Sequence, residues 1–185
     1  MYGLVNKAVE QMVRSAHGLD TWERIKAEAG VDTEGFISNQ PYPDEITYRL
    51  VAAGSDVLGV PPEEILKAFG EHWVLHTALE SYGPMMWALG KTLPEFLQKL
   101  PHLHTRVELI YPKLQPPEFA CHEVSDTELD LHYWTRRPPG LEPFVEGLLY
   151  GLGKMFSTPV RVTLIQHRAD GHNHSVFRVA WDKAA

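Results

Sequence analysis

The sequence of 185 residues contains a single cysteine, Cys121. One cysteine excludes an internal disulfide framework and any metal site built from paired cysteines. No run of about 18 apolar residues occurs, so we expect no membrane-spanning helix. The N-terminus also lacks the basic region and apolar run of a signal peptide, which predicts a cytoplasmic protein.

Positive charge is scarce as well, and the formal net charge is −7. Nucleic-acid-binding proteins carry a basic patch, and no cluster of Lys and Arg offsets the acidic balance here, so we expect no nucleic-acid partner. The composition, 44% hydrophobic and 22% charged, is typical of a globular protein. At this length one domain can enclose a core and a buried ligand.

Hydrophobic periodicity divides the chain into an α-rich first part and a mixed last part. Helical spacing is expected over 2–16, 20–29, 42–59, 61–83 and 92–112, with a short apolar turn or helix at 84–90 and an interruption at Pro101. Strands are expected over 118–124, 128–137, 159–167 and 175–182, with a helix over 141–156. The order is that of an α+β protein.

One of the ten histidines is placed unusually for its type. In "LPEFLQKLPHLHTRVELI" the apolar residues form one helical stripe, whose members are Leu93, Leu97, Leu100, Leu103, Val107 and Ile110. At about 100° per residue His104 lies within roughly 50° of the centre of this stripe, and His102 about 150° away. His104 is therefore either a hydrogen-bonded core histidine or the axial ligand of an iron whose other ligands come from a macrocycle.

A second polar group stands at the end of an expected strand, in "LDLHYWTRRPPG". Tyr133, Thr135 and Arg137 share one face, which continues the face of Leu129 and Leu131. Three donors in a row suit a carboxylate or phosphate lying along the strand. The alternative is that this face simply emerges into solvent.

The other histidines and glycine-rich segments give weaker patterns. His167, His172 and His174 gather in a hairpin turn, where a surface metal site is the alternative to a solvated turn. "GLLYGLGKM" lacks the spacing and the Ser or Thr of a phosphate-binding loop.

The chain resembles the H-NOX family, the haem-nitric oxide/oxygen binding domains related to the haem domain of soluble guanylate cyclase. The likeness runs over the whole length, through "MYGLVNKAVEQM", "FGEHWV", "LPEFLQKLPHLHTRV", "LQPPEF", "DLHYWTRR" and "GLLYGLGKMF". The chain is most similar to the cyanobacterial stand-alone members. This resemblance implies a helical subdomain of about residues 1–60 on an α+β subdomain of about 61–185, with a four-stranded antiparallel sheet and haem buried between them.

The resemblance also assigns roles to residues around haem b. His104 corresponds to the axial iron ligand, and the family's Tyr-x-Ser-x-Arg propionate motif falls on Tyr133, Thr135 and Arg137, with Thr keeping the hydroxyl of Ser. Pro117 corresponds to the proline that presses on and distorts the haem, and Leu4 and Val5 match positions near the distal side.

Gas preference follows from the distal residues. Oxygen-binding members use a tyrosine hydroxyl supported by an asparagine; the asparagine position is Trp73 here, and the tyrosine position falls at Phe144. The neighbouring choices, Glu142 and Pro143, are not tyrosines either. The resemblance therefore implies a sensor of NO, and of CO, that excludes O₂, with Tyr2 and Tyr150 as other possible donors.

The family's mechanism is a gas-driven conformational switch rather than catalysis. The N-terminal helical part moves relative to the α+β part, and we expect the signal to reach a separate histidine kinase, cyclic-di-GMP enzyme or chemotaxis protein. Two other classes stay open from the residues. One is a haem peroxidase using His72 or His76 as the distal base, and the other is a non-haem protein that binds a small carboxylate or phosphate at Arg137.

Overall fold

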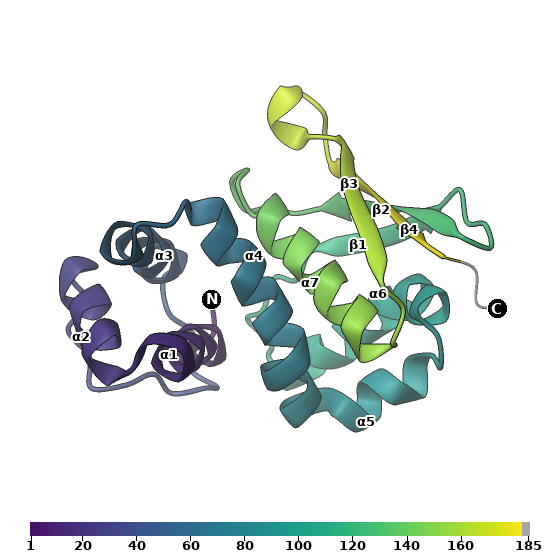
Figure 1. The fold of residues 1–185 in the computed structure, drawn as a ribbon. Helices are drawn as coiled ribbons and strands as arrows, with labels where there is room; N and C mark the ends of the chain where they lie inside the picture. The colour runs from purple at the N-terminus through teal and green to yellow at the C-terminus, as the bar shows by residue number, and fades with distance from the viewer. Residues whose placement is uncertain (183–185) are drawn as a thin grey trace.

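The N-terminal part of the computed structural model, which describes residues 1–182, is a group of three helices (Figure 1). Their bounds are α1 (Gly3–His17), α2 (Leu19–Glu28) and α3 (Asp44–Leu58). Apolar side chains from all three pack around the buried Trp22 and Ile25, together with Phe69 from the next helix. The division of the chain at about residue 60 stays a prediction.

A long helical run follows and contains a change of hydrogen-bonding pattern. It consists of α4 (Pro62–His72), the π-helix η1 (Trp73–Ala78) and α5 (Leu79–Leu89). The sequence predicted a break before Pro84, but Pro84 lies inside α5. Proline removes one backbone donor, and the burial of Met86 and Leu89 just beyond it offsets that loss.

The next helix, α6 (Leu93–Ile110), begins where the sequence predicted. The Thr92 side chain caps it by accepting a hydrogen bond from the amide of Glu95 at 3.4 Å. The helix continues through Pro101 instead of being interrupted there. The predicted apolar stripe was wrong at its end, since Ile110 is 53% exposed.

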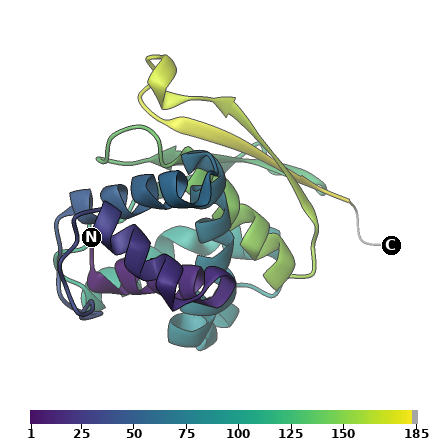
Figure 2. The same cartoon turned by 60° about the vertical axis from the view of Figure 1, so that its left-hand side comes forward.

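The rest of the chain builds a four-stranded antiparallel sheet, as the resemblance implied. Its elements are β1 (Glu118–His122), β2 (Glu128–Trp134), β3 (Val160–Gln166) and β4 (Ser175–Trp181), with α7 (Glu142–Met155) between β2 and β3. The strand order is β1-β2-β4-β3, and every pair is antiparallel. The sheet lies along one side of the helices (Figure 2). The α+β prediction is confirmed.

Strand β2 is shorter than the sequence predicted. Its ladder with β4 ends at the pair Tyr133 and Ser175, because β4 begins at Ser175. Thr135 and Arg137 therefore lie in the segment between β2 and α7, not on the strand. The inference that they share a strand face with Tyr133 was wrong, and their arrangement has another cause, described below.

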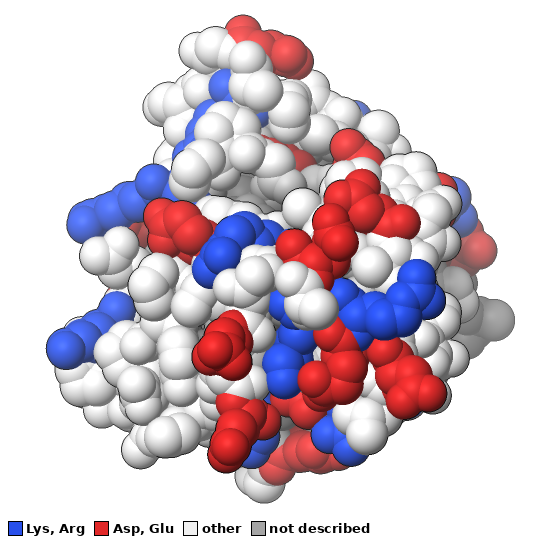
Figure 3. Space-filling view, turned by 90° about the vertical axis from the view of Figure 1, so that its left-hand side faces the viewer, with Lys and Arg blue, Asp and Glu red and all other residues white. Residues whose placement is uncertain are grey.

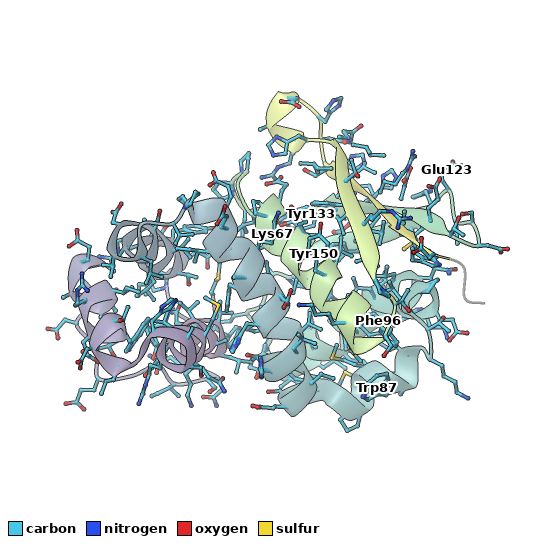
Figure 4. All side chains as sticks on the ribbon, in the orientation of Figure 1. Lys67, Trp87, Phe96, Glu123, Tyr133 and Tyr150 are labelled. Carbon is cyan, nitrogen blue, oxygen red and sulfur yellow. The ribbon has the colours of Figure 1, made fainter. Side chains whose placement is uncertain are left out.

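Helices α4 and α7 cross with their backbones in contact. A Cβ atom at Gly70 would lie 2.2 Å from the carbonyl oxygen of Phe144, and one at Gly147 would lie 2.0 Å from that of Lys67. Figure 4 labels Lys67 on α4 and Tyr150 on α7 at this crossing. Only glycine allows so close an approach, and the contact fixes α7 against the helix that carries Trp73.

Both signs of charge are mixed over the face formed by the N-terminal helices, and no basic patch gathers there (Figure 3). Within residues 1–182 no helix combines the length and the apolar character needed to cross a bilayer.

Candidate functional site

His104 is a half-buried residue on α6, whereas His102 is exposed. Its Nδ1 atom lies 3.1 Å from the carbonyl oxygen of Pro117. A carbonyl can only accept, so Nδ1 carries the proton and donates it, and the lone pair of Nε2 is left free. Burial lowers the pKa of His104, against an opposing effect of the Pro117 hydrogen bond. A neutral imidazole with a free Nε2 is the form that ligates iron.

A groove of about 500 Å³ lies beside this imidazole. The chain after α6 forms one wall, with Leu114 and Pro117, and Phe119 of β1 stands 5.5 Å from the His104 ring, centroid to centroid. Arg136 lines the same groove together with two acidic residues, Glu108 and Glu118. The groove thus combines an aromatic wall, a proline and charges of both signs beside a neutral histidine.

The three predicted donors do come together at the end of β2. Tyr133 is buried, and burial raises the pKa of its phenol, although a hydrogen bond with the Thr135 side chain opposes the rise. The Thr135 hydroxyl oxygen accepts a hydrogen bond from the amide of Arg137 at 3.2 Å. The Thr135 hydroxyl therefore links the Tyr133 phenol to the backbone of Arg137.

Arg137 is anchored on two sides in this structure. Its Nε donates to a carboxylate oxygen of Asp44 at 2.9 Å, and its Nη1 donates to the carbonyl of Gln115 at 2.8 Å. Burial acts to raise the pKa of Asp44, but the N-terminal amine and the Arg137 charge outweigh it and hold that pKa below its ordinary value. The ion pair joins α3 to the segment after β2.

An unsatisfied hydroxyl lies in the same region. The Tyr48 hydroxyl is buried and has no hydrogen-bond partner among the described residues. Burial raises the pKa of Tyr48, and the charges of Asp44 and Arg137 both act on it. A buried donor without a partner is uncommon, and it fits a region that receives an acidic group from a ligand.

Sequence reasoning missed Arg168, which lies in the turn between β3 and β4. Its guanidinium donates to the backbone carbonyls of Thr135 and Arg137 through Nη1 and Nη2. No local sequence signal marks this residue, because its partners lie more than thirty positions earlier in the chain.

The predicted distal residues Trp73 and Phe144 both pack against Phe69. The ring of Phe69 is 6.1 Å from that of Trp73 and 5.2 Å from that of Phe144. Val5 packs against the same apolar cluster. Leu4 instead lines a cleft of about 470 Å³ between α1 and α5, so the structure does not bring all of the predicted distal residues to one place.

The two tyrosines considered as other donors have partners elsewhere. The Tyr2 hydroxyl accepts a hydrogen bond from the amide of Lys113 at 3.1 Å, and its ring lies 4.7 Å from that of Tyr111. Tyr150 is hydrogen-bonded to Glu146, and burial is the main cause that raises its pKa.

The histidines of the hairpin turn do not form a metal site. His174 stacks on Trp134, and its Nε2 lies 2.8 Å from Nδ1 of His132 on β2. Within the described part of the chain no group of three or more His, Cys, Asp or Glu residues could hold a metal ion.

A family model described as Haem-NO-binding matches residues 2–164. The chain belongs to this family. It is 29% identical over 181 residues to soluble guanylate cyclase gcy-31 of Caenorhabditis elegans, an alignment that covers 97% of this chain and 26% of that protein. It is 32% identical over 178 residues to gcy-35 of the same organism, covering 93% and 25%. The chain thus spans about a quarter of the length of these relatives.

Solved H-NOX structures share the fold. An H-NOX protein from S. oneidensis in the Fe(II)NO state has a TM-score of 0.87 at 18% identity, and the match covers 99% of this chain and 100% of that one. The unliganded Fe(II) H-NOX protein from K. algicida also has a TM-score of 0.87, at 22% identity, covering 100% and 98%. The H-NOX resemblance is therefore confirmed, and haem is the cofactor of this gas-sensor domain.

The residues present fit that cofactor. His104 offers a free Nε2 on a neutral ring beside the groove, and Arg137 and the orphaned Tyr48 hydroxyl offer donors suited to carboxylates. The site therefore offers a nitrogen suited to the haem iron and donors suited to the haem propionates.

Proposed function

We propose that this H-NOX domain senses nitric oxide through haem held by His104, and that it excludes O₂. The observation that carries the proposal is the hydrogen bond from His104 Nδ1 to the Pro117 carbonyl. It fixes one tautomer of the ring and leaves Nε2 as the atom that would hold the haem iron. Bound ferrous haem would supply the iron that takes NO or CO.

The remaining residues of the site hold and shape the cofactor. Tyr133, Thr135 and Arg137 would donate to the haem propionates, Arg137 through Nη2 because its Nε and Nη1 atoms hold Asp44 and Gln115. Pro117 follows the loop from α6 and would press on the macrocycle on the histidine side. Because its carbonyl also binds His104, a change at this proline reaches the axial ligand directly.

Gas preference rests on the other side of the site. Trp73 and Phe144 pack on Phe69, and Val5 adds another apolar side chain there. A polar Fe–O₂ unit gains from a phenolic hydrogen bond, about 1–3 kcal/mol when the bond is charge-assisted. The Tyr150 hydroxyl is engaged with Glu146, which supports the absence of that gain from Tyr150, while the Tyr2 hydroxyl accepts from the amide of Lys113. NO and CO depend much less on it.

The output is a change in the contacts between the helical part and the α+β part, passed to another protein. The ion pair of Asp44 with Arg137 joins these parts and lies next to the proposed propionate group, so it is placed to respond to the haem. A histidine kinase, cyclic-di-GMP enzyme or chemotaxis protein is the class of partner that we propose, and the domain itself would catalyse no reaction.

Absorption spectra of the reduced protein under argon, air, CO and NO test the proposal. We expect a five-coordinate ferrous spectrum that is the same under argon and in the first minutes in air, and distinct spectra with CO and NO. A stable oxy complex in air would contradict the exclusion of O₂. A preparation without a Soret band after haem reconstitution would contradict the haem site as a whole.

A further inference from the structure

We propose that Arg168 is a positioning residue for haem, acting through the segment that presents Thr135 and Arg137. The inference rests on the proposed propionate role of these two residues. Arg168 is half-buried in the short 3₁₀ helix η2 (Arg168–Asp170) of the β3–β4 turn.

The contact lies just past the end of the β2–β4 ladder. That ladder ends at the pair Tyr133 and Ser175, so Thr135 and Arg137 have no partners on β4. The chain bends at Arg136 and Arg137. The two Nη atoms of Arg168 donate to the carbonyls of Thr135 and Arg137. One guanidinium therefore holds two backbone positions of this bent segment.

Arg168 is itself fixed by a buried polar group. Its amide donates to the Ser175 hydroxyl oxygen at 3.1 Å, and that hydroxyl donates to Glu142 at 2.9 Å. The Glu142 carboxylate is buried and also accepts from the amide of Gly140 at 2.8 Å. Burial acts to raise the pKa of Glu142, but these hydrogen bonds hold it below its ordinary value. The carboxylate therefore ties the arginine-bearing turn to the start of α7.

Charge gives Arg168 a second effect at the same place. The positive charges of Arg137 and Arg168 both act on the Tyr133 phenol and oppose the rise in its pKa. A cation that acts on this phenol also favours a carboxylate placed beside Tyr133. Position and charge can be separated, because lysine keeps the charge but has no planar fork to reach two carbonyls.

The test compares haem loss from the parent, Arg168→Gln and Arg168→Lys, measured by transfer to excess apomyoglobin. Because charge-assisted hydrogen bonds are lost, Arg168→Gln should release haem about tenfold faster than the parent. Arg168→Lys should release haem nearly as fast as Arg168→Gln. Arg161→Gln is the matched control, since Arg161 is an exposed residue of β3 that pairs with Asp182 at 3.1 Å. Release at the parent rate from Arg168→Gln would overturn the inference, as would full recovery by lysine.

Haem dimethyl ester separates positioning from general support of the fold, because it lacks propionate charges. The parent and Arg168→Gln should lose the ester at rates within about twofold of each other, following the logic of a double-mutant cycle. An equal tenfold effect on the ester would show a merely structural role and overturn the inference. In the haem-free proteins, the amides of Arg137 and Gly140 should exchange hydrogen faster in Arg168→Gln than in the parent.

Failure of the proposed function has a different signature. If the parent forms no haem complex, the haem site and this inference fall together. If the parent complex is normal and Arg168→Gln releases haem at the parent rate, the inference alone fails.

Discussion

The imidazole of His104 and the carbonyl of Pro117 are joined by a hydrogen bond of 3.1 Å, so α6 and the loop after it are coupled at the residue that we propose as the iron ligand. The bond orients the ring and fixes its tautomer. A ligand histidine held in this way has its Nε2 aimed by the protein and not by the iron.

Replacing His104 with glycine should remove the axial ligand and abolish stable haem retention. Added imidazole should restore a Soret band, because it can occupy the space of the lost side chain. The measurement is the ratio of Soret to protein absorbance after purification, with and without imidazole. His102→Gly is the control, since His102 is exposed on the same helix and should retain haem as the parent does.

Phe144→Tyr should give the protein an affinity for O₂ that the parent lacks. The added hydroxyl supplies a hydrogen-bond donor near the apolar cluster of Phe69 and Trp73, about 1–3 kcal/mol for a charge-assisted bond. Stopped-flow mixing of the ferrous protein with air-saturated buffer measures the effect. Phe156→Tyr adds the same hydroxyl next to Trp87 and Phe96 (Figure 4), and should leave O₂ binding unchanged.

Gly147→Ala should lower the free energy of unfolding by about 1–3 kcal/mol, the usual cost of overpacking. The new methyl would lie 2.0 Å from the Lys67 carbonyl oxygen, so α4 and α7 would have to separate. Urea denaturation measures the change. Gly83→Ala is the matched control in α5, where a Cβ meets nothing within 4 Å. It should stabilise the protein by about 0.4–1 kcal/mol, and equal losses in both variants would contradict the account of the crossing.

Lowering the pH from 7.5 to 5.5 should destabilise the folded protein through the histidines on the outer side of the sheet. Burial and neighbouring histidines lower the pKa values of His132 and His174 below 6.5. The unfolded chain then binds more protons as the pH falls through 6.5, so stability decreases there. Carboxylates contribute only nearer their ordinary pKa values of 3.8 and 4.5.

His132→Gln should reduce this loss of stability, because it removes one of the groups whose pKa is lowered in the folded protein. Urea denaturation at the two pH values gives the difference for parent and variant. His17→Gln, at an exposed histidine of α1, should lose as much stability as the parent. If His132→Gln loses as much stability as the parent between the two pH values, the lowered pKa of His132 is not a cause of that loss.

The parts of the fold that could be predicted from the sequence are those set by local periodicity. Helical phase alone separated His104 from His102, and the two sides of α6 differ in exposure as that phase predicts. The cap at Thr92 and the strand pattern of the last third are also local properties.

What the sequence did not show depends on contacts between distant segments. Strand β2 ends early because β4 begins only at Ser175, and its continuation is held by Arg168 from another turn. Helix α5 likewise continues through Pro84 because Met86 and Leu89 are buried in the core. That burial overrides the local preference of a helix to stop at proline. Neither contact leaves a signal in the neighbouring residues.

The π-helix between α4 and α5 has a consequence for how this segment can vary. A π-turn holds one more residue than an α-turn, and each residue of an α-helix turns the chain by about 100°. Deleting one residue within Trp73–Ala78 would therefore narrow the wide turn to an ordinary α-turn and leave α5 in phase, with Met86 and Leu89 still facing the core. The same deletion in the first half of α5 would instead rotate both side chains by about 100° away from it. The wide turn is thus a place where the chain can shorten without changing which face of α5 is buried.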